Sequence, residues 1–222
     1  MTSILAALIG IALLVVAAWA VRLQWRVGPI ALAAAALCVA FAYDSLVLGA
    51  GRLIGYGSTL EALSVPRFWI HAIAIPLLIP VVGVLVARLG VEQARSRNLA
   101  LGLAALVAML ILIGVIVDGV RLDLAPKDAG DMERYINAAA DGVSLPVIIT
   151  VLALIVLGMA ALRYAQFYLL MPAAILFLAT SATASLIPWV GCAGFLVMMA
   201  AIVYAMKTVA DREARDLERQ ET

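Results

Sequence analysis

The sequence predicts an all-α integral membrane protein, a seven-transmembrane helix bundle with its N-terminus outside and its C-terminus in the cytoplasm. Of the 222 residues, 66% are hydrophobic and only 13% are charged, with a mean hydropathy of +1.14. This leaves too little polar surface for a water-soluble domain. Seven stretches are apolar over roughly the 20 residues that a membrane helix needs. Lysine and arginine also gather in alternate connections between these stretches.

The first apolar stretch is predicted to be a membrane helix and not a signal peptide. A signal peptide has positive charge before its apolar run, whereas Arg22 and Arg26 follow this one. The last two stretches are joined only by "IPW" and are expected to form a tight helical hairpin. The seven predicted spans are Ile4–Val21, Pro29–Leu48, Phe68–Ala87, Leu99–Val117, Leu145–Leu162, Phe167–Leu186 and Val190–Met206.

The distribution of basic residues predicts the orientation. Ten lysines and arginines follow the first, third, fifth and seventh spans, and five lie on the opposite side. The side with ten is expected to be cytoplasmic, in a bacterial-type inner (plasma) membrane. Residues 1–207 then form a single seven-helix domain, and residues 208–222 form a charged cytoplasmic tail.

The tail is expected to be an exposed helix. Asp211 and Arg215 stand at i,i+4 spacing, as do Arg212 and Asp216, and such pairs stabilise a solvated helix. The tail is then either a solvated extension or a docking segment for a partner.

Polar residues of several spans are predicted to converge in the outer leaflet. At 1.5 Å per residue, Asp44 lies about 24 Å above the cytoplasmic start of its helix, and His71 lies about 7 Å below the outer surface. Asp118 ends the fourth span on the outside, and Thr180 to Ser185 occupy the outer half of the sixth. The cytoplasmic halves are almost entirely Ala, Leu, Val and Ile. The sequence therefore predicts an outer-leaflet polar pocket.

Ionisable residues within a membrane usually face a bundle interior or a wet cavity, because burying them costs several kcal/mol. We predict that Asp44 and His71 face each other as a catalytic acid–base pair. Arg52 or Arg67 is expected to bind an anionic headgroup, and Pro76 is expected to kink the helix beneath His71. The remaining predicted substrate-binding residues are Tyr56, Asp118, Thr180 and Thr183.

Each candidate also has an ordinary interpretation. His71 is then an interfacial or structurally satisfied histidine, and Asp44 lies at the headgroup boundary. Arg67 is a snorkelling anchor, and Asp118 marks a helix end. The threonines of the sixth span then pack helices together instead of binding a ligand.

Two outer connections contain further signals. Ser58 and Glu61 have the spacing of a capping box, which favours a short interfacial helix or a re-entrant turn before the third span. Gly51 and Gly55 form a weak helix-dimer motif at a helix end. The acidic connection Gly119–Gly142 is expected to be either a lid over the pocket or a solvated loop, and its acids lack EF-hand spacing.

Several classes of site are excluded by composition. One histidine and two scattered cysteines, Cys38 and Cys192, do not supply the ligands of a metal or haem site, so no cofactor is expected. The lysine that binds retinal in the middle of the last helix of microbial rhodopsins has no counterpart, because Lys207 lies at the cytoplasmic end. A net charge of +1 gives no basic surface for nucleic acid.

These observations favour an integral membrane protein that binds a lipid or isoprenoid-like hydrophobic molecule in the outer pocket and modifies it by acid–base chemistry. Two alternatives remain open. The chain is a non-enzymatic membrane subunit, sensor or assembly factor, or it is a small-solute carrier. The partners expected are a membrane lipid or hydrophobic small molecule, and a second copy of the chain or another membrane subunit.

Overall fold

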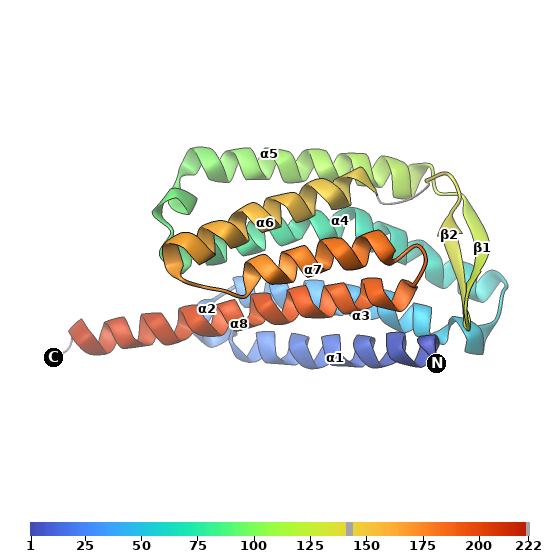
Figure 1. Ribbon diagram of the computed structural model, residues 1–222, viewed down its shortest axis with the longest axis horizontal. Coiled ribbons are helices and arrows are strands. Elements are labelled where there is room, and N and C mark those ends of the chain that lie inside the picture. Colours follow the sequence, from blue (N-terminus) through green and yellow to red (C-terminus); the bar gives the residue numbers. More distant parts are fainter. Residues whose placement is uncertain (141–143, 221–222) are drawn as a thin grey trace.

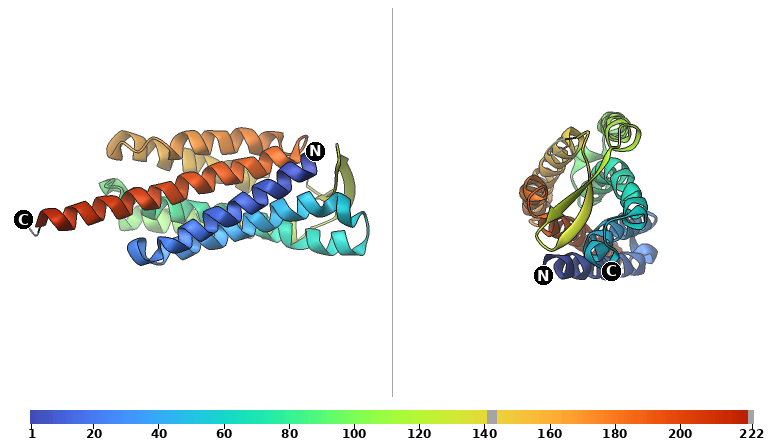
Figure 2. Two further views of the ribbon diagram at one scale, coloured as in Figure 1. Left: turned by 90° about the horizontal axis from the view of Figure 1, so that it is seen from below. Right: turned by 90° about the vertical axis from the view of Figure 1, so that its right-hand side faces the viewer.

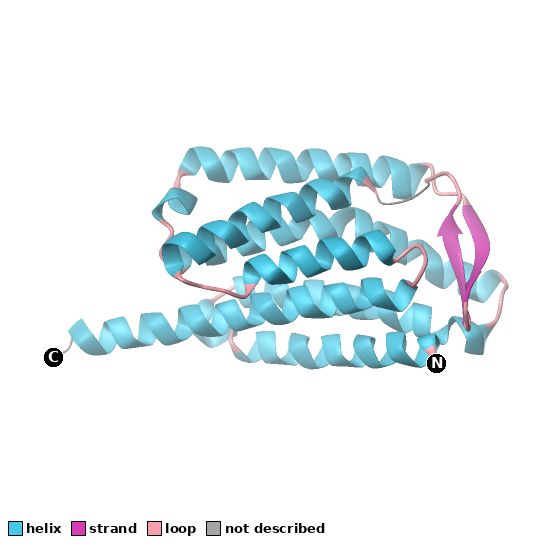
Figure 3. Cartoon of the chain, in the orientation of Figure 1, coloured by secondary structure: helices cyan, strands magenta, loops and turns pink. Residues whose placement is uncertain are grey.

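The computed structural model describes residues 1–140 and 144–220 as a helical bundle with a β-hairpin at one end (Figures 1 and 3). Six helices are long and apolar enough to cross a membrane, which supports the predicted all-α membrane bundle. A seventh, α7 (Leu170–Thr183), is shorter. The long helices are α1 (Thr2–Arg22), α3 (Ile30–Ile54), α4 (Ser58–Arg88), α5 (Arg97–Gly114) with its continuation η2 (Val115–Val120), α6 (Leu145–Ala165) and α8 (Pro188–Gln220).

Short elements connect the long helices. Single turns, α2 (Gln24–Val27) and η1 (Glu92–Arg95), lie at one end of the bundle, and the hairpin of β1 (Leu124–Ala129) and β2 (Met132–Asn137) lies at the other. Successive helices run in alternate directions, so the two termini lie at opposite ends (Figure 1). We call these the hairpin end, which holds the N-terminus, and the tail end, from which the last part of α8 projects.

The helix α7 corrects the predicted sixth span. The sequence favoured Phe167–Leu186, but α7 has 14 residues, or about 21 Å, less than the roughly 30 Å of a hydrocarbon core. The hydroxyls of Thr180 and Thr183 donate to carbonyls of the preceding turn of α7, and such bonds compete with regular helix geometry. Pro188 then begins α8. Among the described residues, the bundle therefore has six helices long enough to cross a membrane and one shorter apolar helix, α7.

The helix α4 also differs from expectation at its start. It runs unbroken from Ser58, with Gly57 as N-cap and no side-chain cap bond, so neither the capping box nor a separate interfacial helix forms. It contains Pro66, Pro76 and Pro80. Each proline lacks the amide hydrogen that would bond the carbonyl four residues earlier. Three carbonyls of one helix are thereby left without their usual partner.

The hairpin replaces the irregular loop expected between the fourth and fifth spans. The strands pair antiparallel from Leu124–Asn137 to Ala129–Met132, leaving a two-residue turn. Gly130 has φ +66°, the positive value that a tight hairpin turn requires and that glycine adopts without strain. Seen end-on in Figure 2, the hairpin lies across the end of the ring of helices. Asp141, the last acid of the expected loop, lies outside the described residues.

The turn of the hairpin is attached to the start of α1. The carboxylate of Asp131 accepts hydrogen bonds from the Met1 ammonium, from the Thr2 hydroxyl and from the Thr2 amide, the last at 2.9 Å. The Ser3 hydroxyl donates to the Asp131 carbonyl at 2.8 Å. A carboxylate at a helix N-terminus also interacts favourably with the helix dipole. These bonds hold the hairpin tip against the bundle.

The attachment of the hairpin is expected to weaken in acid. The hydrogen bond from the Met1 ammonium is the main reason that the pKa of Asp131 lies below its ordinary value of 3.8. The resulting stabilisation is therefore present above that value and is lost as pH falls through the lowered pKa. Amide exchange of residues 124–137 should accelerate, relative to the helices, as pH is lowered below about 4. Asp131→Asn should remove this pH dependence, whereas a dependence that persists in the variant would contradict the assignment.

The charged part of α8 contacts the ends of neighbouring helices where it leaves the bundle. Arg88 forms a two-pronged ion pair with Glu213, through Nε at 3.1 Å and a terminal nitrogen at 2.8 Å, and also donates to the Val27 carbonyl. Arg212 donates to the carbonyls of Leu89 and Ala165. The predicted pairs of Asp211 with Arg215 and of Arg212 with Asp216 do not form, because Arg212 donates to those carbonyls and Asp211 pairs with Arg26 at 2.9 Å. The helix α8 runs without a break past residue 207.

Removing the Arg88 contact should loosen the tail end modestly. We expect Arg88→Gln to lower the free energy of unfolding by about 1 kcal/mol, because the lost ion pair is partly exposed and only one hydrogen bond to a carbonyl is lost with it. Thermal unfolding in detergent measures this. Glu218→Gln, a matched change on the exposed part of α8, should have no measurable effect. Equal effects of the two variants would show that Glu213 and Arg88 do not anchor the tail.

Candidate functional site

A cavity of about 600 Å³ lies under the hairpin. Its walls come from α3, α4, η2, α6, α7 and α8, and the hairpin covers it. All eight buried polar side chains of the described residues belong to this hairpin-end half of the bundle. The apolar core fills the tail-end half. The acidic and basic side chains lining the cavity are Asp44, Arg67, His71, Asp118, Lys127 and Arg134.

A buried carboxylate lies at the centre of this group. Asp44 of α3 is 1% exposed, and the Arg67 Nε of α4 donates to its Oδ1 at 2.7 Å. The His71 Nε2 lies 3.4 Å from the other oxygen, Oδ2, within ion-pair distance but outside hydrogen-bonding geometry. One carboxylate thus faces two basic side chains. Breaking such a buried pair leaves an uncompensated charge, which is strongly unfavourable.

Local helix geometry explains why the three groups meet. Arg67 and His71 are four residues apart and so lie on one face of α4, which packs against α3. The sequence predicted the approach of Asp44 and His71 from depth alone. It did not predict that Arg67 would be the nearer partner of Asp44, since it treated Arg67 as an anchor or headgroup ligand. The His71 ring also contacts Phe195 of α8, with centroids 5.6 Å apart.

Asp118 lies on the cavity wall in the π-helical turn η2. The Asn137 amide of β2 donates to the Val117 carbonyl at 3.1 Å and to Asp118 Oδ1 at 3.4 Å. Wide turns of this kind occur often at functional sites. Asp118 therefore lines the cavity and is held there by Asn137 of the hairpin.

The hairpin provides residues that sequence reasoning missed. Lys127, Arg134 and Asn137 line the cavity, and a terminal nitrogen of Arg134 donates to the Ser185 carbonyl at 2.9 Å. In the sequence, Lys127 and Arg134 entered only the count of basic residues. The Gly-Asp turn between two short paired segments is the signal that would have placed them on facing strands.

Four predicted binding residues lie away from the cavity lining. Arg52 is exposed. Tyr56 is also exposed and donates to Asp128 Oδ1 at 2.5 Å, and partial burial followed by this bond raises its pKa to about 12. The Thr180 and Thr183 hydroxyls are bonded within α7. Their neighbours Ser181 and Ser185 line the cavity instead.

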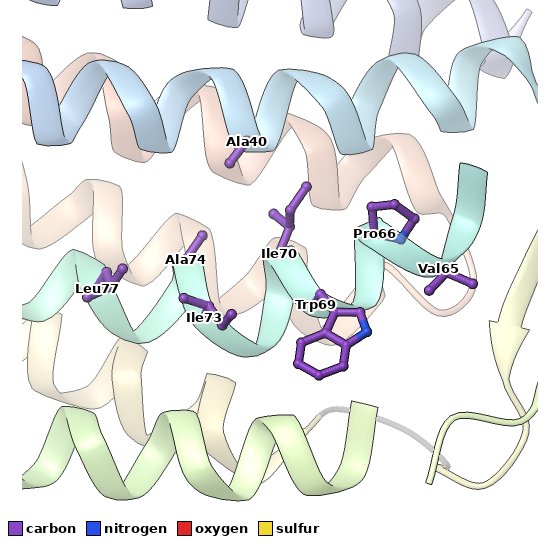
Figure 4. Close-up of a pocket in the computed structure, with 8 residues that line it drawn as sticks. All are labelled: Ala40, Val65, Pro66, Trp69, Ile70, Ile73, Ala74 and Leu77. Atoms are coloured by element: carbon purple, nitrogen blue, oxygen red, sulfur yellow. The ribbon is translucent and has the colours of Figure 1, made fainter. Parts of the chain in front are cut away.

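A second hollow, of about 520 Å³, lies on the other side of α4 (Figure 4). Its wall is almost entirely apolar and includes Ala40 of α3 together with Trp69 and Ile73 of α4. The Trp69 ring lies so close to Gly119 that a Cβ there would contact it. No ionisable side chain lines this hollow, so it offers surface for a hydrocarbon chain and no chemistry.

The described residues contain no group of three or more His, Cys, Asp and Glu side chains arranged to hold a metal ion. Cys38 and Cys192 are both buried and free. No protein family matches the chain, and no curated protein matches it significantly in sequence. The function of the protein is therefore inferred from the geometry of the cavity.

Proposed function

We propose that the protein binds the polar end of a lipid or isoprenoid-like molecule in the cavity under the hairpin and moves a proton on it through His71. The observation that supports this is the position of His71. Its side chain is one-third exposed to the cavity, while its Nε2 lies 3.4 Å from a carboxylate that is buried and ion-paired. A histidine oriented by a carboxylate is a common general acid or base.

Each residue of the group has a distinct part in this proposal. Asp44 orients the imidazole and stabilises its protonated form. Arg67 keeps Asp44 ionised by donating to it. Asp118, on the opposite part of the wall, is close enough to interact with His71 electrostatically. The apolar part of the ligand would lie against side chains such as Ile75, Val147 and Phe195, which line the same cavity.

The proposal includes the orientation predicted from the basic residues, with the hairpin outside and the tail in the cytoplasm. The ligand would then enter from the outer leaflet. The distribution of buried polar groups disfavours a small-solute carrier. Among the described residues, these groups are confined to the hairpin-end half. Transport sites tend instead to lie near the middle of the membrane. A non-enzymatic subunit is distinguished from the proposed function by the experiment below.

Lipid extraction and native mass spectrometry of the purified protein test the proposal. We expect a specific hydrophobic molecule to co-purify with the parent protein. Ser181→Phe, which places a bulky ring at the cavity wall, should abolish its retention. Ala182→Phe, the same kind of change at the neighbouring exposed position, should not. An empty parent protein, or equal retention by both variants, would favour the non-enzymatic subunit.

A histidine variant tests the chemistry separately from binding. His71→Gln should still retain a ligand, because the cavity keeps its shape. The retained molecule should be the unreacted form, an isomer of the molecule held by the parent protein that chromatography and fragmentation distinguish, because a proton shift alone leaves the mass unchanged. Identical molecules in both proteins would mean that His71 moves no proton in this site.

A further inference from the structure

The hairpin presents two like charges side by side to the cavity. Lys127 of β1 and Arg134 of β2 are directly opposite in the register, so their side chains leave the same face of the hairpin. Both line the cavity. Like charges directly opposite on a β-ladder are destabilising. An anion placed between them would relieve this repulsion.

The next pair along the ladder has the opposite sign. Asp128 and Glu133 are also directly opposite, and the period of two in a strand places them on the other face. The Asp128 carboxylate accepts the Tyr56 hydroxyl there, outside the cavity lining. The basic pair of the hairpin therefore lines the cavity, whereas the acidic pair next to it does not.

Arg134 is buried without a counter-charge. It is 9% exposed, and within the described chain no carboxylate lies at ion-pair distance from it. Its one hydrogen bond goes to the Ser185 carbonyl, and its buried Nε has none. A guanidinium has five donors, and leaving them unpaired away from water is costly. Burial, followed by the charge of Arg67, holds the pKa of Arg134 below its ordinary value.

The other charges of the cavity do not compensate Arg134. Among the described residues, three basic side chains and two carboxylates line the cavity, so one positive charge of this set is in surplus even when His71 is neutral. Arg67 is matched by Asp44 at 2.7 Å. Asp118 accepts from Asn137. The surplus therefore lies on the hairpin side, at Lys127 and Arg134.

We propose that the ligand is an anionic amphiphile whose head-group oxyanion lies between Lys127 and Arg134. Arginine binds phosphate and carboxylate oxygens with two parallel hydrogen bonds, which would satisfy the donors that are now unpaired. The hydrocarbon lies against the apolar wall deeper in the cavity. This inference rests on the proposed function, because it assigns the charge of the molecule that the cavity binds.

Dodecyl phosphate tests the assignment, with dodecanol and inorganic phosphate as its uncharged and free-anion counterparts. Binding of each is measured by calorimetric titration of the full-length protein in a neutral detergent. We expect dodecyl phosphate to bind at least about tenfold more tightly than either counterpart, since a charged hydrogen bond contributes about 1.5–3 kcal/mol. Its affinity should also fall as salt is raised.

Three variants test whether the hairpin residues bind the phosphate group of dodecyl phosphate. Arg134→Gln keeps a donor for the Ser185 carbonyl and should weaken dodecyl phosphate binding about tenfold or more. Lys127→Gln, at an exposed position that does not endanger folding, should weaken it severalfold. Arg52→Gln is the matched control, because Arg52 lies at the same end of the bundle but outside the cavity lining. Its affinity should equal that of the parent protein.

The outcomes separate this inference from the proposed function. If dodecanol binds as tightly as dodecyl phosphate and Arg134→Gln changes neither, the ligand is neutral and only the inference fails. If neither alkyl compound binds, the proposed function fails with it. If inorganic phosphate binds as tightly as dodecyl phosphate, the site holds a free anion and the amphiphile is excluded. If Arg52→Gln weakens binding as much as Arg134→Gln, the hairpin pair is not the site.

Discussion

Asp44→Asn is expected to lower the free energy of unfolding by about 3–5 kcal/mol, the largest effect of any single polar substitution in the bundle. The change removes a negative charge that is 1% exposed and leaves Arg67, itself 7% exposed, without its counter-ion. An asparagine keeps the volume and one acceptor, so the loss is electrostatic and not a matter of packing. Denaturant unfolding in detergent measures the effect.

Ser45→Ala is the control for this prediction. Ser45 is equally buried on the same helix, but it carries no charge, and its hydroxyl donates to the Phe41 carbonyl within α3. Its loss should have a small effect, about 1 kcal/mol or less. Adding Arg67→Met to Asp44→Asn should restore part of the lost stability, since the unpaired charge is then gone. An Asp44→Asn protein as stable as Ser45→Ala would show that the ion pair is not structural.

Gly51→Ala is expected to displace the hairpin and to destabilise the protein by about 1–3 kcal/mol. A Cβ at position 51 of α3 would overlap the backbone carbonyl oxygen of Glu133 in β2. That contact is with backbone, so it cannot be relieved by a rotamer change and the strand itself must shift. The sequence motif of Gly51 and Gly55 suggested a helix dimer. In the structure, the absence of a side chain at Gly51 lets the backbone of β2 pack closely against α3.

The stability change expected for Gly51→Ala is opposite in sign to that of an ordinary Gly→Ala substitution in a helix. An alanine normally stabilises the interior of a helix relative to glycine by roughly 0.5–1 kcal/mol. Gly102→Ala in α5, where a Cβ has open space around it, should follow that rule. Gly51→Ala should do the opposite and should also speed amide exchange in residues 124–137. Stabilisation by both substitutions would mean that the hairpin does not rest on α3.

The sequence located much of the candidate site because depth in a membrane is a one-dimensional property. Counting residues from the ends of apolar runs brought Asp44, His71 and Asp118 to one half of the bundle, and all three line the cavity. The rotation of each helix about its axis is not available from such a count. This is why Thr180 and Thr183 were expected at the site, whereas their neighbours Ser181 and Ser185 occupy it.

The sequence did not predict the β-hairpin, for a different reason. Its first strand contains Pro126 and Asp128, residue types that are uncommon in strands, and the two strands bury only part of their length. Their pairing is maintained by the Gly-Asp turn, by the bonds of Asp131 to the start of α1, and by the close approach to Gly51. These are contacts between segments far apart in the chain, so no local pattern announces them.

By itself, the sequence determined the class of the protein, the number of apolar helices and the half of the bundle where ionisable side chains gather, since these follow from hydrophobic length and composition. The tertiary structure alone decided that Arg67 is the nearest partner of Asp44 and that α7 is short. It also decided that Lys127 and Arg134 stand opposite each other over the cavity. Helix rotation and strand register arise from packing between distant segments, and packing sets which charges are paired and which are left unpaired.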